Sequence, residues 1–157
     1  MPGLVSRPGP AMPPQMVTDA AALIALFGNA LLAGSILPAQ SELVLAAMLH
    51  AGSLSPWLLV AVATAGNVLG ACLNYLLGRS AARFRHRRWF PLTDAGWQRA
   101  TRLFNRYGVG TLLLSWLPII GDGFTLIAGA ARTPPWLFLA LVTLAKGGRY
   151  AVLAALF

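Results

Sequence analysis

The sequence predicts an all-α, polytopic membrane protein with two inverted repeats, each a re-entrant hairpin followed by a transmembrane helix. Three observations lead to this prediction. The 157 residues are 57% hydrophobic and only 10% charged, whereas a soluble domain is about 25% charged. The apolar residues fall into long blocks. Two similar frames, S-x-L-P-x-x-S-E at Ser35–Glu42 and S-x-L-P-x-x-G-D at Ser115–Asp122, each interrupt one of these blocks.

The basic residues are concentrated between the apolar blocks. The formal net charge is +8, and eight of the twelve Lys and Arg residues lie between Arg79 and Arg106. A basic loop beside membrane spans is the usual mark of the cytoplasmic side. The chain carries no aromatic-basic motif of a known nucleic-acid module. We therefore expect a cytoplasmic loop over residues 79–107 and no nucleic-acid partner.

A single membrane domain is predicted over residues 20–157. Residues 1–19 contain five prolines and little apolar content, so they are predicted to be a disordered tail. No signal-peptide cleavage pattern follows the apolar block Ala20–Leu37, which we expect to be retained.

The first hairpin is predicted over residues 20–52. Its first segment, Ala20–Leu37, is about 27 Å long if helical, and Pro38 interrupts it. Its second segment, Leu43–Leu49, makes only two turns, which is too short to cross a hydrocarbon core of about 30 Å. The chain is therefore expected to turn near Pro38 and to leave on the side where it entered.

The first span is predicted over residues 56–78, because Pro56-Trp57 suits a helix start at the membrane interface. Gly66 and Gly70 permit close approach of a neighbouring helix. One face of this helix is small and polar, and it is either a tight helix interface or the wall of a polar pathway. This face comprises Asn67, Gly70, Ala71 and Asn74.

A short helix is predicted within the basic loop, with Thr93 or Asp94 as its N-cap and its end at Tyr107. Apolar and basic side chains occupy different sides of it, which is typical of an interfacial helix lying on anionic headgroups. A specific lipid-headgroup site is the alternative. The apolar side comprises Trp97, Ala100, Phe104 and Tyr107, and the basic side Arg99, Arg102 and Arg106.

The second half repeats the pattern of the first. A hairpin is predicted over residues 109–131, with a break at Pro118 and its tip at Gly121–Gly123. Pro135-Trp136 opens the last span, predicted over residues 135–157. Because a hairpin returns to its own side and a span crosses, the two halves enter from opposite faces. Such inverted repeats are a recurrent build of secondary transporters.

Each hairpin places one carboxylate inside the membrane. Desolvation favours the protonated form of a buried carboxyl, so Glu42 and Asp122 are predicted to exchange protons or to pair with cations, and to approach each other near the midplane. The alternative is that each acid caps the N-terminus of a short helix.

The cations available to these acids are Arg132, Lys146 and Arg149. Lys146 and Arg149 lie at i and i+3 near the middle of the last span, where each charge costs at least about 2.5 kcal/mol. We expect them to pair with Asp122 and Glu42. Arg132 is predicted to join this cluster or to snorkel to the interface. The cluster would bind a phosphate-bearing lipid headgroup or relay protons.

Enzyme motifs are missing from the sequence. His50 and His86 have no metal-ligand spacing, and no Ser-His-Asp grouping falls at one membrane depth. We therefore expect no enzymatic reaction, no metal and no cofactor.

Six motifs follow one another in a recognisable order. They are L-P-x-x-S-E (Leu37–Glu42), G-x-x-x-N-Y-x-x-G-R (Gly70–Arg79), F-x-R-Y-G (Phe104–Gly108), S-W-L-P-I-I-G-D (Ser115–Asp122), A-G-x-x-R (Ala128–Arg132) and A-K-G-G-R-Y (Ala145–Tyr150). This order resembles the YqaA branch of the DedA family, also called VTT-domain or SNARE-associated proteins.

The resemblance covers about residues 30–157. It implies a multi-pass protein of the bacterial inner membrane with two opposed re-entrant hairpins. It also implies a role in lipid translocation and in envelope homeostasis that depends on proton-motive force. Glu42 corresponds to the acid of the first hairpin. The YqaA-like pattern is matched by Asp122, Arg132, Lys146 and Arg149. Typical DedA members carry arginines where this chain has Ser115 and Gly121.

The sequence therefore predicts a transporter or lipid translocase that is proton-coupled. Its expected partners are membrane lipids, with anionic headgroups at the basic loop, and protons or a phospholipid as substrate; homo-oligomer formation is left open. A non-transporting membrane scaffold or assembly factor is the alternative. The residues assigned to hairpin and helix packing are Pro38, Gly66, Gly70, Asn74, Pro118 and Gly121.

Overall fold

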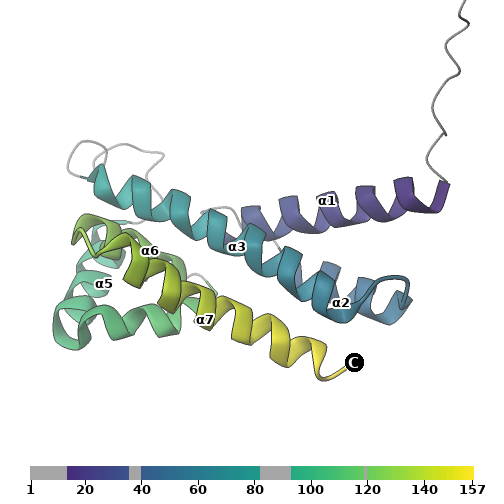
Figure 1. The fold of residues 1–157 in the computed structure, drawn as a ribbon. Coiled ribbons are helices and arrows are strands. Elements are labelled where there is room, and N and C mark those ends of the chain that lie inside the picture. The colour runs from purple at the N-terminus through teal and green to yellow at the C-terminus, as the bar shows by residue number, and fades with distance from the viewer. Residues whose placement is uncertain (1–13, 36–39, 82–92, 119) are drawn as a thin grey trace, which may run out of the picture.

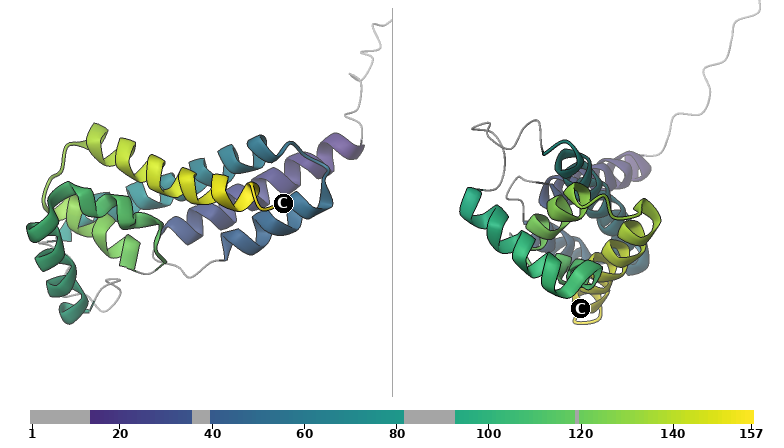
Figure 2. Two further views of the ribbon diagram at one scale, coloured as in Figure 1. Left: turned by 90° about the horizontal axis from the view of Figure 1, so that it is seen from below. Right: turned by 90° about the vertical axis from the view of Figure 1, so that its left-hand side faces the viewer.

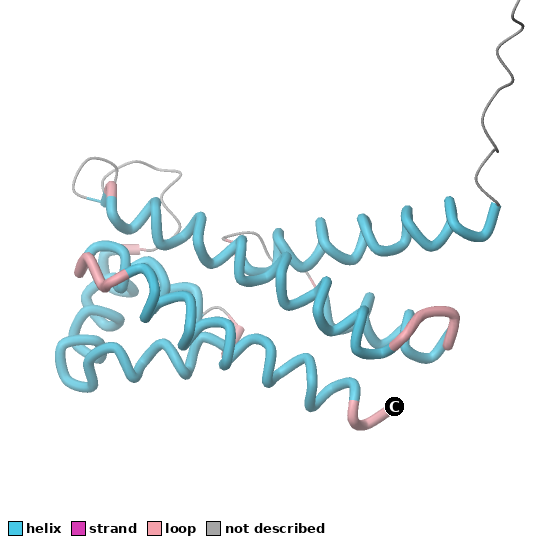
Figure 3. Tube along the Cα trace, in the orientation of Figure 1, coloured by secondary structure: helices cyan, strands magenta, loops and turns pink. Residues whose placement is uncertain are grey.

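The computed structural model describes residues 14–35, 40–81, 93–118 and 120–157. These residues form six α-helices and one 3-10 helix, with no strand among them (Figures 1 and 3). Three helices are long and apolar enough to cross a membrane, namely Gln15–Gly34, Pro56–Arg79 and Pro135–Ala154. The predicted all-helical class is confirmed for this part of the chain.

The first arm consists of α1 (Pro14–Gly34) and α2 (Ser41–Ala51). α1 begins six residues before the predicted start at Ala20, so the predicted disordered tail is wrong for residues 14–19. These residues continue the helix because none of residues 15–19 is proline and both Gln15 and Met16 favour helix. Residues 1–13 and Pro38 lie outside the described part of the chain.

α1 ends halfway along α3 (Pro56–Arg79). A Cβ atom added at Gly34 would meet the carbonyl oxygen of Asn67, which lies at the middle of α3. Gly66 and Gly70 likewise face backbone carbonyls of α1. For these two glycines the tight-interface interpretation holds, since any side chain there would push the helices apart. From this point α2 runs back toward the start of α3 (Figure 1).

The second arm approaches the same middle point from the other end of the molecule. It consists of η1 (Gly108–Trp116), a 3-10 helix, and α6 (Ile120–Ala130). Figure 2 shows η1 reaching the middle of the bundle and α6 returning from it. A 3-10 helix rises about 2.0 Å per residue, against 1.5 Å in an α-helix, so the nine residues of η1 reach further toward the middle than an α-helix would.

The break between η1 and α6 lies beside Pro118, as predicted, but the turn comes earlier than the predicted tip. The tip was expected at Gly121–Gly123, whereas these residues lie in the first turns of α6, and the extended residue is Leu117, with φ −72° and ψ 129°. The physical reason is that the residue before a proline, here Pro118, is driven out of the helical region. Once past Pro118 the chain is free to resume a helix.

α7 (Pro135–Ala154) runs the length of the molecule antiparallel to α3 (Figures 1 and 2). Both helices carry proline in their first turn, as predicted from the repeated Pro-Trp pair. Trp57 and Trp136 are 74% and 70% exposed and stand at the starts of the two helices, hence at opposite ends of the bundle. Tryptophan is enriched at both membrane interfaces.

α5 (Asp94–Tyr107) packs across the second arm. Thr93 is its N-cap, as predicted, because its side-chain oxygen accepts a hydrogen bond from the Gly96 amide at 3.2 Å. Ala100 and Phe104 are buried. Tyr107 was assigned to this apolar side but is 60% exposed, because it lies in the last turn beside the chain reversal at Gly108.

The two larger apolar clusters among the described residues lie one in each half of the molecule. The first joins Leu26, Ala30, Leu45, Leu59 and neighbouring residues of α1, α2, α3 and the end of α7. The second joins the other end of α3 to α5, η1, α6 and the start of α7, and it includes Tyr75, Phe104, Leu112, Phe124 and Phe138.

Candidate functional site

Four charged side chains meet where the two arms converge on α7. The Lys146 ammonium nitrogen lies 3.7 Å from Asp122 Oδ1, and Arg149 Nη2 lies 2.6 Å from Glu42 Oε1. Glu42 is in the first turn of α2, and Asp122 is in the first turn of α6. The structure thus makes both ion pairs that were expected from the sequence, and each pair joins one arm to the same helix.

The carboxylates do not cap these helices. The N-cap of α2 is Gln40, and it makes no side-chain capping hydrogen bond. Glu42 is the second residue of α2 and Asp122 the third residue of α6. At these positions a carboxylate still interacts favourably with the helix dipole, but its oxygens remain available to the cations of α7.

The two ion pairs differ in exposure. The side chains of Lys146 and Asp122 are 6% and 24% exposed, whereas those of Arg149 and Glu42 are 29% and 32% exposed. Arg149 Nη1 also donates a hydrogen bond of 2.8 Å to the carbonyl oxygen of Trp116, the last residue of η1. Arg149 therefore contacts both arms and is partly exposed, whereas the side chain of Lys146 is almost fully buried.

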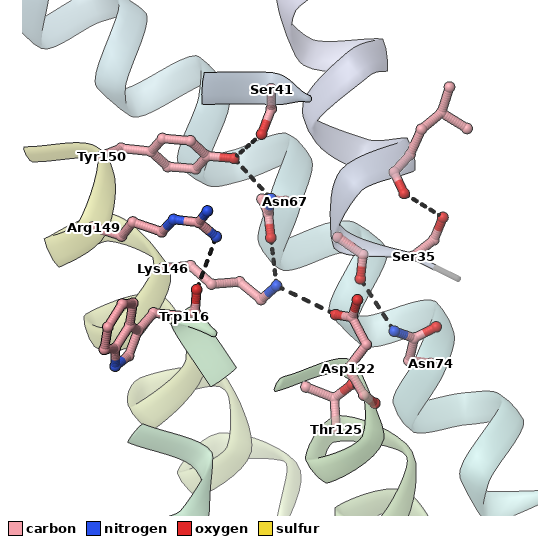
Figure 4. A network of polar contacts seen from close by, with 12 residues as sticks. Ser35, Ser41, Asn67, Asn74, Trp116, Asp122, Thr125, Lys146, Arg149 and Tyr150 are labelled. Atoms are coloured by element: carbon pink, nitrogen blue, oxygen red, sulfur yellow. Dashed lines mark hydrogen bonds and ion pairs between the residues drawn. The ribbon is translucent and has the colours of Figure 1, made fainter. Parts of the chain in front are cut away.

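A hydrogen-bonded chain continues from Lys146 into the first arm (Figure 4). Lys146 Nζ donates to Asn67 Oδ1 at 2.5 Å, and Asn67 Nδ2 donates to the Tyr150 hydroxyl at 2.7 Å. The Tyr150 hydroxyl lies 2.7 Å from Ser41 Oγ. All four side chains are buried. Asn67 thus belongs to the polar site, whereas the glycines of its helix face belong to the interface with α1.

Tyr150 and Ser41 are site residues that the sequence analysis did not assign. The available signal was the spacing of Tyr150, which lies four residues after Lys146 and hence on the same face of α7. Ser41 precedes Glu42 directly, and both residues belong to the first turn of α2.

Asn74, assigned to helix packing, is 1% exposed and donates from Nδ2 to the carbonyl oxygen of Gly34 at 3.1 Å. It therefore secures the end of α1 against α3. Gly121 packs against the backbone of Ser115, and a Cβ atom at position 121 would meet that carbonyl oxygen. Any side chain at position 121, including the arginine that the family resemblance led us to compare, would require this backbone to move.

Arg132 does not join the cluster. It is exposed at the turn between α6 and α7 and has a positive φ of 55°. Within the described residues no ion pair joins it to Glu42 or Asp122. The reason is geometric: α6 carries the chain away from the middle of the bundle, so its last residues and this turn lie at the end of the bundle (Figure 2).

The four charged groups form a formally neutral set of two carboxylates and two cations. Buried charges are tolerated when they are paired and hydrogen-bonded. Protonation of either acid would leave a cation without its partner and create a local positive charge. An anionic group bound at the released cation would restore the neutrality of the set.

Known proteins resemble this chain over most of its length. The family model of the VTT domain matches residues 37–157. The chain is 41% identical over 141 residues to "Inner membrane protein YqaA" of Escherichia coli (strain K12), covering 88% of this chain and 93% of the relative. It is 38% identical over 135 residues to a Haemophilus influenzae protein, covering 80% and 76% of the two chains. No solved structure matches the chain.

Proposed function

Since this chain belongs to the VTT-domain family, in its YqaA/DedA branch, and its relative is an inner membrane protein, we propose that it moves a lipid across the bacterial inner membrane with proton coupling. The observation that carries the proposal is the meeting of two acid–cation pairs at the tips of two arms, on one membrane-length helix. Intramembrane ionisable groups of this kind are costly and mark substrate or ion pathways.

The proposed architecture is an inverted repeat with two re-entrant hairpins. α2 and α6 have 11 residues each, about 16 Å of helix, and neither crosses a core of about 30 Å. α1 is long enough to span, but it stops against the middle of α3. The arms enter from opposite ends and each is followed by a helix that opens on Pro-Trp, which supports the proposal.

In this mechanism the acids carry the protons and the cations receive the headgroup. When Glu42 is protonated, Arg149 is released from its 2.6 Å pair and offers its guanidinium to an anionic headgroup. Asp122 and Lys146 form the enclosed counterpart on the other arm. Binding and proton exchange are the roles that we propose for these residues.

Flux measurements in liposomes test this function. We expect fluorescent phospholipid to move across liposomes that contain the purified protein, at a rate that rises with an imposed proton gradient. Glu42→Gln and Asp122→Asn should each reduce the rate to that of protein-free liposomes, because neither amide exchanges a proton. Asp19→Asn, which changes an acid of α1 outside the cluster, should leave the rate unchanged.

Two outcomes of this experiment count against the proposal. Equal flux in Glu42→Gln and in the unaltered protein would remove the acids from the mechanism. Flux at the protein-free level in every folded form would favour a non-transporting scaffold or assembly factor.

The basic end of the molecule is proposed to face the cytoplasm, with α5 on anionic headgroups. Among the described residues, five arginines gather where α3 ends and α7 begins, and the arginines of α5 point away from its buried face. These are Arg79, Arg99, Arg102, Arg106 and Arg132. Positive charge on cytoplasmic loops and attraction to anionic lipid support this placement.

A labelling experiment tests the orientation. With Cys72→Ala as background, we expect a membrane-impermeant maleimide to label Arg99→Cys in inside-out membrane vesicles but not in intact spheroplasts. Ser53→Cys, on the exposed turn at the other end of the bundle, should show the reverse pattern. Labelling of Arg99→Cys in spheroplasts would place the basic end outside.

A further inference from the structure

A continuous chain of buried polar contacts joins the acid of the second arm to the first residue of the helix that carries the acid of the first arm. It begins at Asp122, passes through Lys146, Asn67 and Tyr150, and ends at Ser41 (Figure 4). Its links come from α6, α7, α3 and α2. The chain therefore links Asp122 to the residue beside Glu42, although each acid pairs with a different cation.

The directions of the first two hydrogen bonds in this chain are fixed. The Lys146 ammonium has donors only, so the Asn67 amide must turn its oxygen toward it. The amide nitrogen then faces Tyr150 and donates to the hydroxyl. With that bond made, either Tyr150 or Ser41 can donate in the contact between their hydroxyls. If the Asn67 amide turns over, Tyr150 uses its only proton on Asn67, and Ser41 alone can donate.

We propose that Asn67 and Tyr150 are positioning residues that couple the state of the Asp122–Lys146 pair to the seating of Ser41 at the start of α2. Removal of the lysine charge allows the amide to turn over, so that Tyr150 donates to Asn67 and Ser41 must donate to Tyr150. The charged groups that act on Lys146 are Asp122 from α6, Arg149 from α7 and Glu42 from α2.

The coupling has a direct consequence for the proposed transport, on which its functional meaning rests. Ser41 immediately precedes Glu42, so a change at Asp122 reaches the residue beside the other acid. A coupling free energy is reciprocal, and a change at Glu42 or Ser41 must act equally on Asp122. A carrier whose two arms alternate needs such a connection, and this chain of polar contacts runs from one arm to the other.

A mutant cycle measures the coupling without any substrate. We expect Asp122→Asn and Ser41→Ala to be non-additive in the melting temperature of the protein in detergent micelles. The double variant should deviate from the sum of the single shifts by about 2–4 °C. In a Tyr150→Phe background, which lacks only the bridging hydroxyl, the two shifts should become additive.

Tyr75→Phe is the matched control for this cycle. Tyr75 is also buried, and its hydroxyl donates to the carbonyl oxygen of Thr133, outside the chain. Non-additivity should therefore persist in the Tyr75→Phe background. Additive shifts in the unaltered chain, or non-additivity that survives Tyr150→Phe, would overturn the proposal. If Tyr150→Phe does not fold, the cycle in the unaltered chain decides alone.

The outcome is independent of the transport assay. A cycle that shows coupling in a protein that moves no lipid would sustain this inference and remove the proposed function. Transport with fully additive shifts would do the opposite. In a transporting protein we also expect Tyr150→Phe to change the pH dependence of flux, whereas Tyr75→Phe should leave it unaltered.

Discussion

Lys146→Met is expected to lower the free energy of unfolding by about 3 kcal/mol, because removing one partner of an enclosed ion pair leaves the other uncompensated. Met fills a similar volume but leaves the Asp122 carboxylate and the Asn67 amide oxygen without the ammonium. The loss should appear as unfolding at a lower fraction of denaturing detergent in mixed micelles.

Two further variants test whether burial of the ion pair explains this loss of stability. Arg149→Met should cost about 1–2 kcal/mol, because its ion pair is half-open to solvent and one backbone hydrogen bond is lost with it. Adding Asp122→Asn to Lys146→Met should restore part of the stability, since the unpaired charge disappears. A larger loss for Arg149→Met than for Lys146→Met would show that burial does not govern these pairs.

Gly78→Ala and Gly129→Ala are each expected to destabilise the fold by about 1–3 kcal/mol, the usual cost of overpacking. The two glycines mark where α3 and α6 touch backbone to backbone. A Cβ atom at Gly78 would meet the carbonyl oxygen of Leu126, and one at Gly129 would meet that of Tyr75. A carbonyl of a helix cannot rotate away as a flexible side chain can, so the helices must separate.

Gly28→Ala is the control for these substitutions. Apart from the backbone of its own helix and its chain neighbours, no heavy atom lies within 4 Å of a Cβ built at Gly28. Alanine there should be neutral or stabilise by up to about 1 kcal/mol through its higher helix propensity. Thermal unfolding of the three variants side by side checks the prediction, and a neutral Gly78→Ala would contradict the close contact.

Much of the fold was accessible from the sequence because membrane helices are strongly marked. The spans at Pro56 and Pro135 were located to within a few residues, since length, apolar content and the Pro-Trp pair agree there. The start of α1 was missed because prolines in the first 14 residues masked a short stretch compatible with helix. The 3-10 conformation of η1 was not predicted. It depends on how far this segment extends toward the middle of the bundle, which the local sequence does not specify.

The charged residues of the site could be predicted from the sequence, whereas the hydrogen bonds that connect them could not. A cation in an apolar span needs an acidic partner nearby, and this chain has few acids. Asp122 and Glu42 were therefore the expected partners of Lys146 and Arg149, and the structure contains both pairs. Arg132 was expected near these acids for the same reason, but it lies in the turn after α6. Its position is determined by the path of α6, which the sequence does not specify. Tyr150 was not assigned to the site from the sequence. Its place in the site follows from the structure, in which its hydroxyl lies between Asn67 and Ser41.

The sequence by itself determined that this is a helical membrane protein with two Pro-acid frames and two Pro-Trp-opened spans, because hydropathy and helix-breaking residues act locally. The tertiary structure alone decided which cation meets which acid, which pair is enclosed, and how the pairs are linked through Asn67 and Tyr150. Those features depend on how four helices approach one another. Such distances arise from packing between residues far apart in the chain, which no local pattern encodes.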